Sequence, residues 1–315
     1  MSAAPDPLVP GPQPIGEGAP IPAPTSEVGV EQRYPLRGAA FGQAVRGRIG
    51  ANASLISGLI IVGLLMAVAI LAGVLSPHDP VKQEIDNTLA PPGAAGHLLD
   101  TDQLGRDVLS RLLHGARTDI FVALGALVCP FLIGTFVGIW AGYRGGWFDS
   151  VVVGIIDVII AFPILVLLIA LVFVLGPGIA TIVIAVTAID WVVYARLART
   201  SSRRERAMEY VMAARVGGIP TYRILARHVL PNIIAQSVVY AMSDAVLIIL
   251  FITTLGFLGL GVPPPAPDWG TMIAEAQPYF NTQWWLAVIP GLAIILTGLG
   301  LSLIADGLAQ KLDAR

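Results

Sequence analysis

Three carboxylates stand inside long apolar runs of this sequence, where an ionised group is costly: Asp157, Asp190 and Asp244. A charged side chain at the centre of a lipid bilayer costs at least about 2.5 kcal/mol, so an acid retained there is by default a functional candidate. Asp157 and Asp190 lie near one end of their runs. We therefore expect these two to reach interfacial water or to pair with an arginine such as Arg196 or Arg199.

Asp244 lies deeper in its run, with Ser237 among its neighbours. Thr253 and Thr254 are weaker candidates for a polar path, because hydroxyl groups in membrane helices often bond to their own backbone. Our candidates for the lining of a translocation path are Asp244, Ser243, Tyr240 and Asp157.

The remaining polar residues do not form the pattern of an enzyme. We find no nucleophile–base constellation and no Walker A pattern GxxxxGK[ST], so the chain does not bind ATP by that device. No two of the histidines His78, His97, His114 and His228 have the spacing of metal ligands, and we expect no metal or cofactor in this chain. The single cysteine, Cys129, excludes an intrachain disulfide.

The composition indicates that a lipid bilayer is the solvent for most of these residues. The chain has 315 residues, of which 55% are hydrophobic and 13% charged, and its mean hydropathy is +0.76. Such a surface would be too apolar for a soluble monomer. The net charge of -2 gives no indication of nucleic-acid binding. Residues 1–50 are predicted to form a mostly disordered cytoplasmic tail that ends in a basic segment.

Six apolar runs are long enough, or nearly so, to cross a bilayer. They cover residues 55–75, 119–141, 150–174, 179–196, 233–259 and 285–305. Helices are expected throughout, because backbone polar groups in lipid must be satisfied within the segment, and continuous apolarity excludes barrel strands. Gly176-Pro177-Gly178 predicts a tight turn between the third and fourth runs. Gly134 and Gly138 indicate close helix packing, and Pro130 and Pro163 predict kinks.

The basic residues favour one orientation of these helices. With the N-terminus inside, the only Lys and Arg residues on the outside are Lys82, Arg106, Arg111 and Arg117, out of 19. Positive residues are retained on the cytoplasmic side. We therefore predict that both termini and the loop at 197–232 are cytoplasmic. The loop at 76–118 is then external, and within it Leu104–Arg117 is predicted to be a helix that lies along the membrane surface.

The longest polar interval in the second half of the chain runs from Glu209 to Asn232, EYVMAARVGGIPTYRILARHVLPN. Its markers are the small pair Ala213 and Ala214, then Gly218, then the closing pair Leu230 and Pro231. Alanines allow the close approach of another protein, and a glycine allows a backbone turn that a side chain would hinder. The interval is thus suited to docking a soluble partner on the cytoplasmic side.

This interval resembles the EAA loop of the membrane subunits of bacterial ABC importers, and RHVLPN is the form typical of the oligopeptide, dipeptide and nickel branch. Met212 stands where the family usually has Glu, and His228 where it usually has Ile. The other matches are TDQLGRDVLSRLLHGAR at 101–117, GYRGG at 142–146 with Asp149, Asp157 to Phe162-Pro163, LGFLGLG at 255–261 with WGTM at 269–272, and DGL at 306–308 with Leu312-Asp313. Asp100 replaces the Gly usual before Thr101.

The resemblance implies an all-α, polytopic membrane protein with six transmembrane helices over residues 51–315, in the type I ABC importer permease (MetI-like) fold. It implies a non-catalytic, C-type permease subunit for oligopeptides or dipeptides in the bacterial inner membrane. The implied partners are a second, homologous permease, two ATPase subunits that carry ATP and Mg²⁺, and an extracytoplasmic substrate-binding protein. The residues implied to couple to the ATPases are Glu209, Ala213, Ala214, Arg215, Gly218, Leu230 and Pro231.

Three alternatives stay open on the sequence. In the first, the chain belongs to an importer whose cargo is nickel or another peptide-like solute. In the second, an ion-coupled secondary transporter would use Asp157, Asp190 and Asp244 without any ATPase partner. The third is a membrane scaffold that associates with other proteins but forms no pore.

Overall fold

The computed structural model of the chain describes residues 37–313, and it describes side chains over 52–94 and 96–312. Of the tail predicted over residues 1–50 to be mostly disordered, residues 1–36 fall outside the described residues, whereas 37–50 belong to the helix that begins at Arg37. Residues Gln43–Arg315 form one compact unit, separate from Met1–Gly42. The arrangement described below is that of the larger unit.

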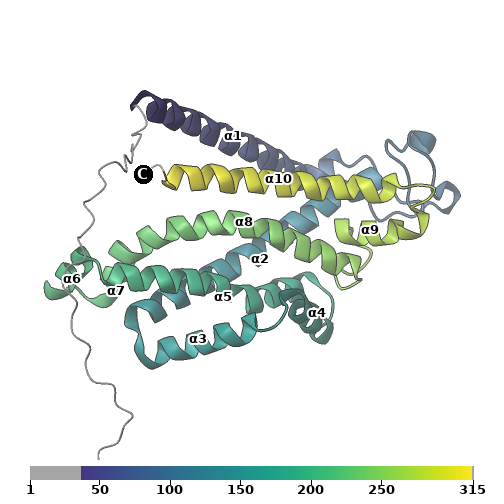
Figure 1. Cartoon of the computed structure of the whole chain (residues 1–315). Coiled ribbons are helices and arrows are strands. Elements are labelled where there is room, and N and C mark those ends of the chain that lie inside the picture. Colours follow the sequence, from purple (N-terminus) through teal and green to yellow (C-terminus); the bar gives the residue numbers. More distant parts are fainter. Residues whose placement is uncertain (1–36, 314–315) are drawn as a thin grey trace, which may run out of the picture. The chain divides into compact units, whose positions relative to one another are not determined.

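Helices make up nearly all of the described chain, and residues 37–313 contain no β-strand (Figure 1). The helices are α1 (Arg37–Leu75), α2 (Val108–Arg144), α3 (Gly146–Ile160), α4 (Ile164–Leu175), α5 (Ile179–Arg206), α6 (Glu209–Val216), α7 (Thr221–Ile224), α8 (Leu230–Phe257), α9 (Trp269–Ala276) and α10 (Trp285–Asp313). A π-helical turn, Leu225–Val229, joins α7 to α8. Short 3-10 turns occur at Ile85–Asn87, Ala94–Gly96 and Gln277–Tyr279.

Five segments are each long and apolar enough to cross a membrane, and α3 with α4 makes a sixth if this pair counts as one crossing. The five segments are Asn52–Leu75, Val108–Arg144, Ile179–Arg206, Thr221–Phe257 and Trp285–Leu312. The predicted all-α membrane fold class is confirmed. The predicted tight turn at 176–178 is also confirmed, since α4 ends at Leu175 and α5 begins at Ile179.

The third predicted run is a broken helix. α3 and α4 meet at an angle of 91°. Pro163 is extended, with φ −61° and ψ 122°, and a proline has no backbone N–H with which to continue the helix. At 1.5 Å per residue, α3 is about 22 Å long and α4 about 18 Å, so neither alone crosses a hydrocarbon core of about 30 Å. α2, in contrast, continues through Pro130.

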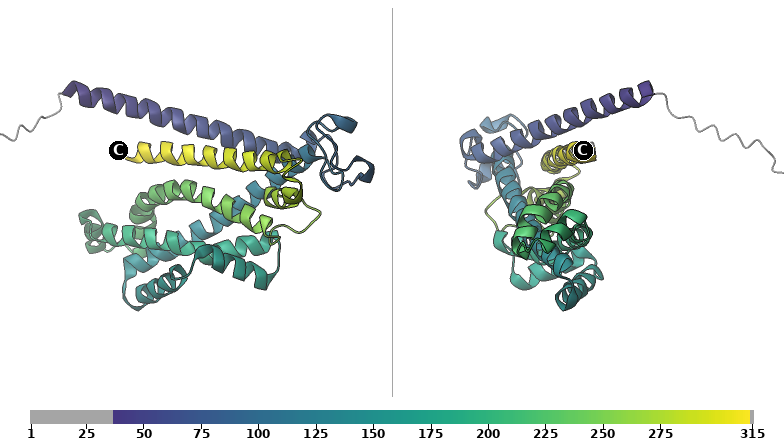
Figure 2. Two further views of the ribbon diagram at one scale, coloured as in Figure 1. Left: turned by 45° about the vertical axis from the view of Figure 1, so that its right-hand side comes forward. Right: turned by 90° about the vertical axis from the view of Figure 1, so that its left-hand side faces the viewer.

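The chain places its polar connections at two opposite ends of the Gln43–Arg315 unit (Figures 1 and 2). α6, α7 and the end of α10 lie at one end, and α9 and the loop before α2 lie at the other. α3 starts at the first end and α4 reaches the second, beside the start of α5. The bent pair thus runs between the same two ends as the longer helices.

The most extensive contact between any two of the described helices joins α2 to α5. Three glycines spaced four residues apart on α2 face backbone carbonyls spaced four residues apart on α5. A Cβ atom would lie 2.2 Å from Trp191 O at Gly134, 2.3 Å from Ala195 O at Gly138, and 2.3 Å from Arg199 O at Gly142. Small residues on one face allow helix backbones to approach closely where no hydrophobic force between helices is available. The close packing predicted at the first two glycines is confirmed.

The core lies where α2, α4, α5 and α8 meet and includes Leu168, Ile182 and Ile248, each almost fully buried. Large apolar side chains such as Val74 and Phe173 are instead exposed on the surface. Exposure of apolar side chains on this scale fits lipid and not water as the surrounding solvent.

The helix predicted over 104–117 is present from Val108 onwards, but it is the first part of α2 and not a helix along the membrane surface. α2 begins at Val108, where the Asp107 carboxylate accepts a hydrogen bond from the Ser110 backbone N–H at 2.7 Å. Residues 108–117 are therefore the first turns of α2 itself. Their apolar face packs against Trp269 and Met272 of α9, because α9 folds back over this part of α2.

Buried charges hold the loop before α2 against α9. Arg106 donates to Asp102 at 2.6 Å and to Glu275 of α9 at 2.7 Å. Arg111, whose side chain is 2% exposed, donates to the same Glu275 carboxylate at 3.0 Å. Charges taken out of water are tolerated when they are paired and hydrogen-bonded, so the charged residues of the 101–117 motif have a structural role here.

The glycine contact between α2 and α5 can be tested with a single methyl group. We expect Gly138→Ala to lower the free energy of unfolding by about 1–3 kcal/mol, because the added carbon would meet a backbone carbonyl that cannot move aside. The matched control is Gly63→Ala on α1, where an added Cβ meets nothing within 4 Å. Thermal melting of the purified protein in detergent measures both. Equal melting temperatures for the two variants would contradict the packing described.

Asp100 makes a pH-dependent contribution to stability. Burial raises the pKa of Asp100 to about 6, although the hydrogen bond from Trp285 Nε1 at 2.6 Å opposes the shift. The folded state therefore holds a proton between about pH 4 and pH 6 that the unfolded state has released, and stability falls as the pH rises through this range. Asp100→Asn should raise stability at pH 7.5 by about 1–2 kcal/mol after allowance for screening, because Asn still accepts from Trp285.

The melting temperature of Asp100→Asn should converge with that of the parent protein towards pH 4. The control is Asp86→Asn, an exposed acid of the same loop, which should change little at either pH. A gain for Asp100→Asn that does not depend on pH would show that loss of the charge is not its cause.

Candidate functional site

The polar interval at 209–232 forms a short helical elbow between α5 and α8. α5 ends at Arg206, α6 covers Glu209–Val216, and α7 leads through the π-helical turn into α8. The elbow projects at the same end of the Gln43–Arg315 unit as the end of α10 (Figure 1). It is thus positioned for contact with another molecule beyond the helices.

Gly218 ends α6 in the way that its sequence position predicts. Its φ is +76°, in the left-handed region that glycine adopts without strain. Gly218 N–H donates to Arg215 O at 3.1 Å, and Ile219 N–H donates to Ala214 O at 3.1 Å. This pair of bonds is a Schellman motif, which satisfies carbonyls at the helix end. The glycine therefore sets the angle between α6 and α7.

One face of the elbow is anchored to the helices. Val211, Ile224 and Val229 are buried in a cluster with Tyr143 of α2 and Ala198 of α5. This cluster holds α6 and α7 on the ends of α2 and α5. A displacement of the elbow must therefore be transmitted to these longer helices.

The opposite face is exposed. Val216 is 89% exposed, and Met212 and Tyr222 are also exposed. The predicted alanine pair divides between the two faces, with Ala213 exposed and Ala214 packed against the cluster. Adjacent residues on a helix point about 100° apart, so the two alanines do not share one face, and a contact of both with a partner stays a prediction.

The other predicted coupling residues also lie on both sides of the elbow. Glu209 is exposed at the first turn of α6. The Arg215 guanidinium lies 5.3 Å from the centre of the Tyr143 ring, a cation–π contact that turns it towards the helices. Leu230 packs against the anchoring cluster, and Pro231 is exposed in the first turn of α8.

A hydrogen-bonded group fixes the elbow to the adjoining helix ends. The Tyr210 hydroxyl donates to the Glu205 carboxylate at the end of α5. Asn232 of α8 donates to Tyr210 Oη at 3.0 Å and to the His228 carbonyl at 3.2 Å. Burial, with the Glu205 carboxylate, raises the pKa of Tyr210, so the hydroxyl keeps its proton and remains a donor. The residues of the RHVLPN segment thus join α6 to both α5 and α8.

The three membrane carboxylates occupy two different environments. Asp157 is 64% exposed and pairs with Arg196 at 3.3 Å, as expected. Asp190 does not form the predicted ion pair, because Arg196 binds Asp157 and Arg199 binds Asp149 at 2.5 Å. Asp157 therefore lies apart from the other two acids.

Asp190 of α5 and Asp244 of α8 lie beside each other, and both are buried. The Tyr194 hydroxyl donates to Asp244 Oδ2 at 2.7 Å, and the Tyr194 ring packs edge-on against Tyr240. Asp190 Oδ2 has no hydrogen-bond partner among the described residues. Two carboxyl groups buried beside each other disfavour two negative charges, and a positive group between them would relieve this repulsion.

A cavity of about 570 Å³ opens between α5, α8 and α10 at the elbow end. Its lining includes the predicted path residues Tyr240 and Ser243, with Asn232 and Gln236. Asp244 does not line this cavity itself but connects to it through Tyr194 and Tyr240. Sequence reasoning missed Tyr194, because an isolated tyrosine in an apolar run carries no signal of its partner.

The hydroxyl groups of the two weaker candidates bond to the backbone of their own helix. Thr253 Oγ1 donates to Ile249 O at 2.9 Å and Thr254 Oγ1 to Leu250 O at 2.6 Å. Both hydroxyls are therefore satisfied within α8, as their position in a membrane helix led us to expect.

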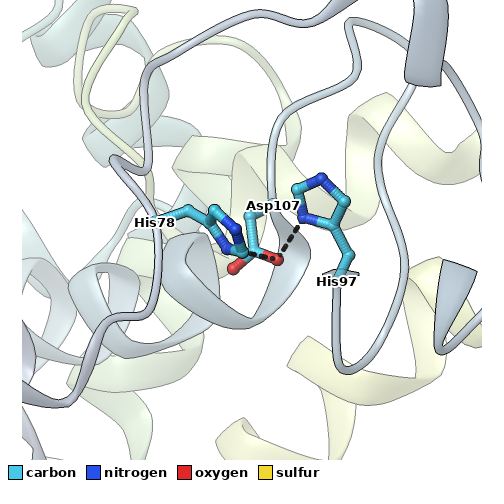
Figure 3. A group of neighbouring side chains, drawn as sticks. All are labelled: His78, His97 and Asp107. Atoms are coloured by element: carbon cyan, nitrogen blue, oxygen red, sulfur yellow. Dashed lines mark hydrogen bonds and ion pairs between the residues drawn. The ribbon is translucent and has the colours of Figure 1, made fainter. Parts of the chain in front are cut away.

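The end opposite to the elbow holds a group that the sequence spacing did not predict. His78, His97 and Asp107 come from three separate stretches and meet at the start of α2 (Figure 3). Burial favours the protonated form of Asp107, but hydrogen bonds from Ser110 and His97 outweigh this effect and lower the pKa of the carboxyl group. The group therefore has an ionised carboxylate beside two imidazoles.

Comparison with known proteins identifies the family. Residues 134–315 match the family described as binding-protein-dependent transport system inner membrane component. Residues 41–92 match the N-terminal TM domain of oligopeptide transport permease C. Together, the two matches cover the first predicted run and, from residue 134 onwards, the other five.

Individual relatives cover almost the whole chain. The di/tripeptide transport system permease protein DppC of Pseudomonas aeruginosa (strain UCBPP-PA14) is 38% identical over 298 residues, which cover 93% of this chain and 96% of that protein. The dipeptide transport system permease protein DppC of Escherichia coli (strain K12) is 38% identical over 269 residues, or 84% of this chain and 90% of that protein. The resemblance drawn from the motifs is confirmed, and this chain belongs to the family of binding-protein-dependent transport system inner membrane components.

Proposed function

We propose that this chain is a transmembrane permease subunit of an ATP-driven importer of dipeptides or oligopeptides. The observation that carries the proposal is the elbow at 209–232, anchored on one face and exposed on the other, in a chain 38% identical to di/tripeptide and dipeptide permeases. The cargo assignment is supported by the names of these relatives. Nickel or another peptide-like solute is the alternative cargo.

The proposed complex contains a second, homologous permease, two ATPase subunits with their ATP and Mg²⁺, and an extracytoplasmic substrate-binding protein. The ATPases would contact the exposed face of α6 and α7, which includes Val216 and Tyr222. The excess of basic residues on the elbow side supports a cytoplasmic location for both termini and the elbow, with the chain in a bacterial inner membrane.

The proposed mechanism is alternating access. Closure of the ATPases on ATP binding would push α6, and the anchoring cluster would transmit this displacement to α2 and α5. Because α5 and α8 also carry Asp190 and Asp244, the same movement would change access to the carboxyl pair. A peptide carries an ammonium group at its N-terminus, and this pair is a suitable binding group for it.

One prediction from this proposal concerns the coupling of the elbow to the ATPases. Gly218→Trp should leave the chain in the membrane but reduce peptide-stimulated ATP hydrolysis of the complex at least tenfold. Apart from its two chain neighbours, no described residue lies within 4 Å of a Cβ added there, so the bulk would meet the partner. ATP hydrolysis by the purified complex in lipid vesicles, with and without peptide and binding protein, gives the measurement.

Backbone strain must be separated from this effect, since the φ of Gly218 is positive. Asn tolerates the left-handed conformation, so Gly218→Asn should retain most of the stimulation. Val216→Asp provides a second variant at a side chain that the described residues leave exposed, and it should also lose stimulation. Normal stimulation in both Gly218→Trp and Val216→Asp would overturn the docking surface.

Another prediction from this proposal concerns the carboxyl pair of Asp190 and Asp244. Asp244→Asn preserves an acceptor for the Tyr194 hydroxyl but removes the charge, so we expect peptide uptake to fall about tenfold, equivalent to about 1.4 kcal/mol, while the complex assembles normally. Uptake of labelled dipeptide into vesicles measures this. Asp157→Asn is the matched control, because that acid is exposed and its ion pair is worth at most about 1 kcal/mol. Equal uptake by the two variants would exclude a role for the pair in transport.

A further inference from the structure

A compact group of two histidines and one aspartate lies at the end of the molecule opposite to the elbow, and the proposed transport function does not use it. His78 follows the end of α1, His97 follows the 3-10 turn Ala94–Gly96, and Asp107 caps the N-terminus of α2. All three side chains point towards one another (Figure 3). The group therefore joins the two ends of the loop at 76–107 to a residue within it.

The distances within the group are those of a metal-binding site that requires little rearrangement. His97 Nδ1 lies 2.8 Å and His78 Nδ1 lies 3.5 Å from the same oxygen, Asp107 Oδ1. One ligand atom from each residue lies within 4.8 Å of the others. In a tetrahedral zinc site with bonds of about 2.0–2.1 Å, neighbouring ligand atoms are about 3.3 Å apart. The two measured distances lie on either side of this value.

The surroundings orient the ligand atoms. Asp107 Oδ2 accepts hydrogen bonds from Ser110 N–H at 2.7 Å and Ser110 O–H at 2.5 Å, so Oδ1 is left to face the imidazoles. Glu84 lies 3.9 Å from His97 Nε2, the ring nitrogen that points away from the group. This distance is too long for a hydrogen bond, so Glu84 acts on His97 only through its negative charge.

One nitrogen of the group, His78 Nδ1, has no hydrogen-bond partner among the described residues. This nitrogen is buried, and Asp107 Oδ1 lies 3.5 Å away without forming a hydrogen bond to it. Buried polar atoms without a partner are rare and call for an explanation such as an ion. His97 and Asp107 are 3% and 1% exposed, whereas the His78 side chain is 35% exposed, so an ion would enter from the side of His78.

We propose that His78, His97 and Asp107 bind a divalent transition-metal ion, with Zn²⁺ as the best match to two imidazole nitrogens and one carboxylate oxygen. The coordination is completed by water at the His78 side. The ion links the end of α1, the loop at 76–107 and the start of α2, and so stabilises the outer loop that holds α9. It is a structural site, separate from the cargo and from any metal on the ATPases.

The test uses the full-length chain, purified in detergent with the subunits that accompany it and freed of metal with a chelator. Titration with Zn²⁺ should raise the melting temperature, and Co²⁺ should produce the visible absorption of a four-coordinate ion, at one equivalent of this chain. His78→Ala and Asp107→Asn should each weaken Co²⁺ binding at least tenfold. Asn is a good N-cap residue, so the second variant retains the start of α2.

His114→Ala is the matched control. His114 lies on α2 close to the group, but its Nδ1 contacts the Ser110 carbonyl at 3.0 Å instead of Asp107. This variant should bind Co²⁺ like the parent protein. Undiminished binding by both His78→Ala and Asp107→Asn, or no spectral change in the folded parent protein, would overturn the site. Neither result bears on transport, which is measured separately by peptide uptake.

Discussion

The approach of α5 to α2 over three glycines is the contact on which the rest of the structure depends. Where Gly134, Gly138 and Gly142 face α5, its carbonyl oxygens occupy the space that a Cβ atom would need. Lipid provides no hydrophobic force that would press two helices together, so close van der Waals contact must do so. α5 leads directly into the elbow and carries Asp190 and Tyr194. The position of α5 therefore fixes both the docking surface and the carboxyl pair.

The elbow combines a firm anchor with an exposed face. Its apolar side is buried on α2 and α5, and Tyr210, Glu205 and Asn232 connect it by hydrogen bonds to α5 and α8. A loosely attached loop would absorb a push from a partner by bending. This elbow is instead held on helices that carry the polar groups of the bundle, and the coupling proposed above depends on that attachment.

Polar residues at the opposite end have a different function. Arg106, Arg111 and Glu275 form buried ion pairs between the loop before α2 and α9. His78, His97 and Asp107 gather a few residues away on the same loop. The two arginines remain buried because each is paired with a carboxylate. The loop before α2 therefore has a fixed position against α9.

The sequence by itself determined the membrane class, the positions of most crossings, the elbow and the turn at Gly218, because these depend on hydrophobicity along the chain and on the backbone freedom of glycine. It also carried the family motifs. Only the tertiary structure decided that residues 108–117 belong to α2, that Ala213 is exposed while Ala214 is partly buried, and that Asp190 lies beside Asp244 and not beside an arginine. It alone brought His78 and His97 to Asp107. Such contacts join residues that are distant along the chain, and local sequence patterns do not contain the packing that brings them together.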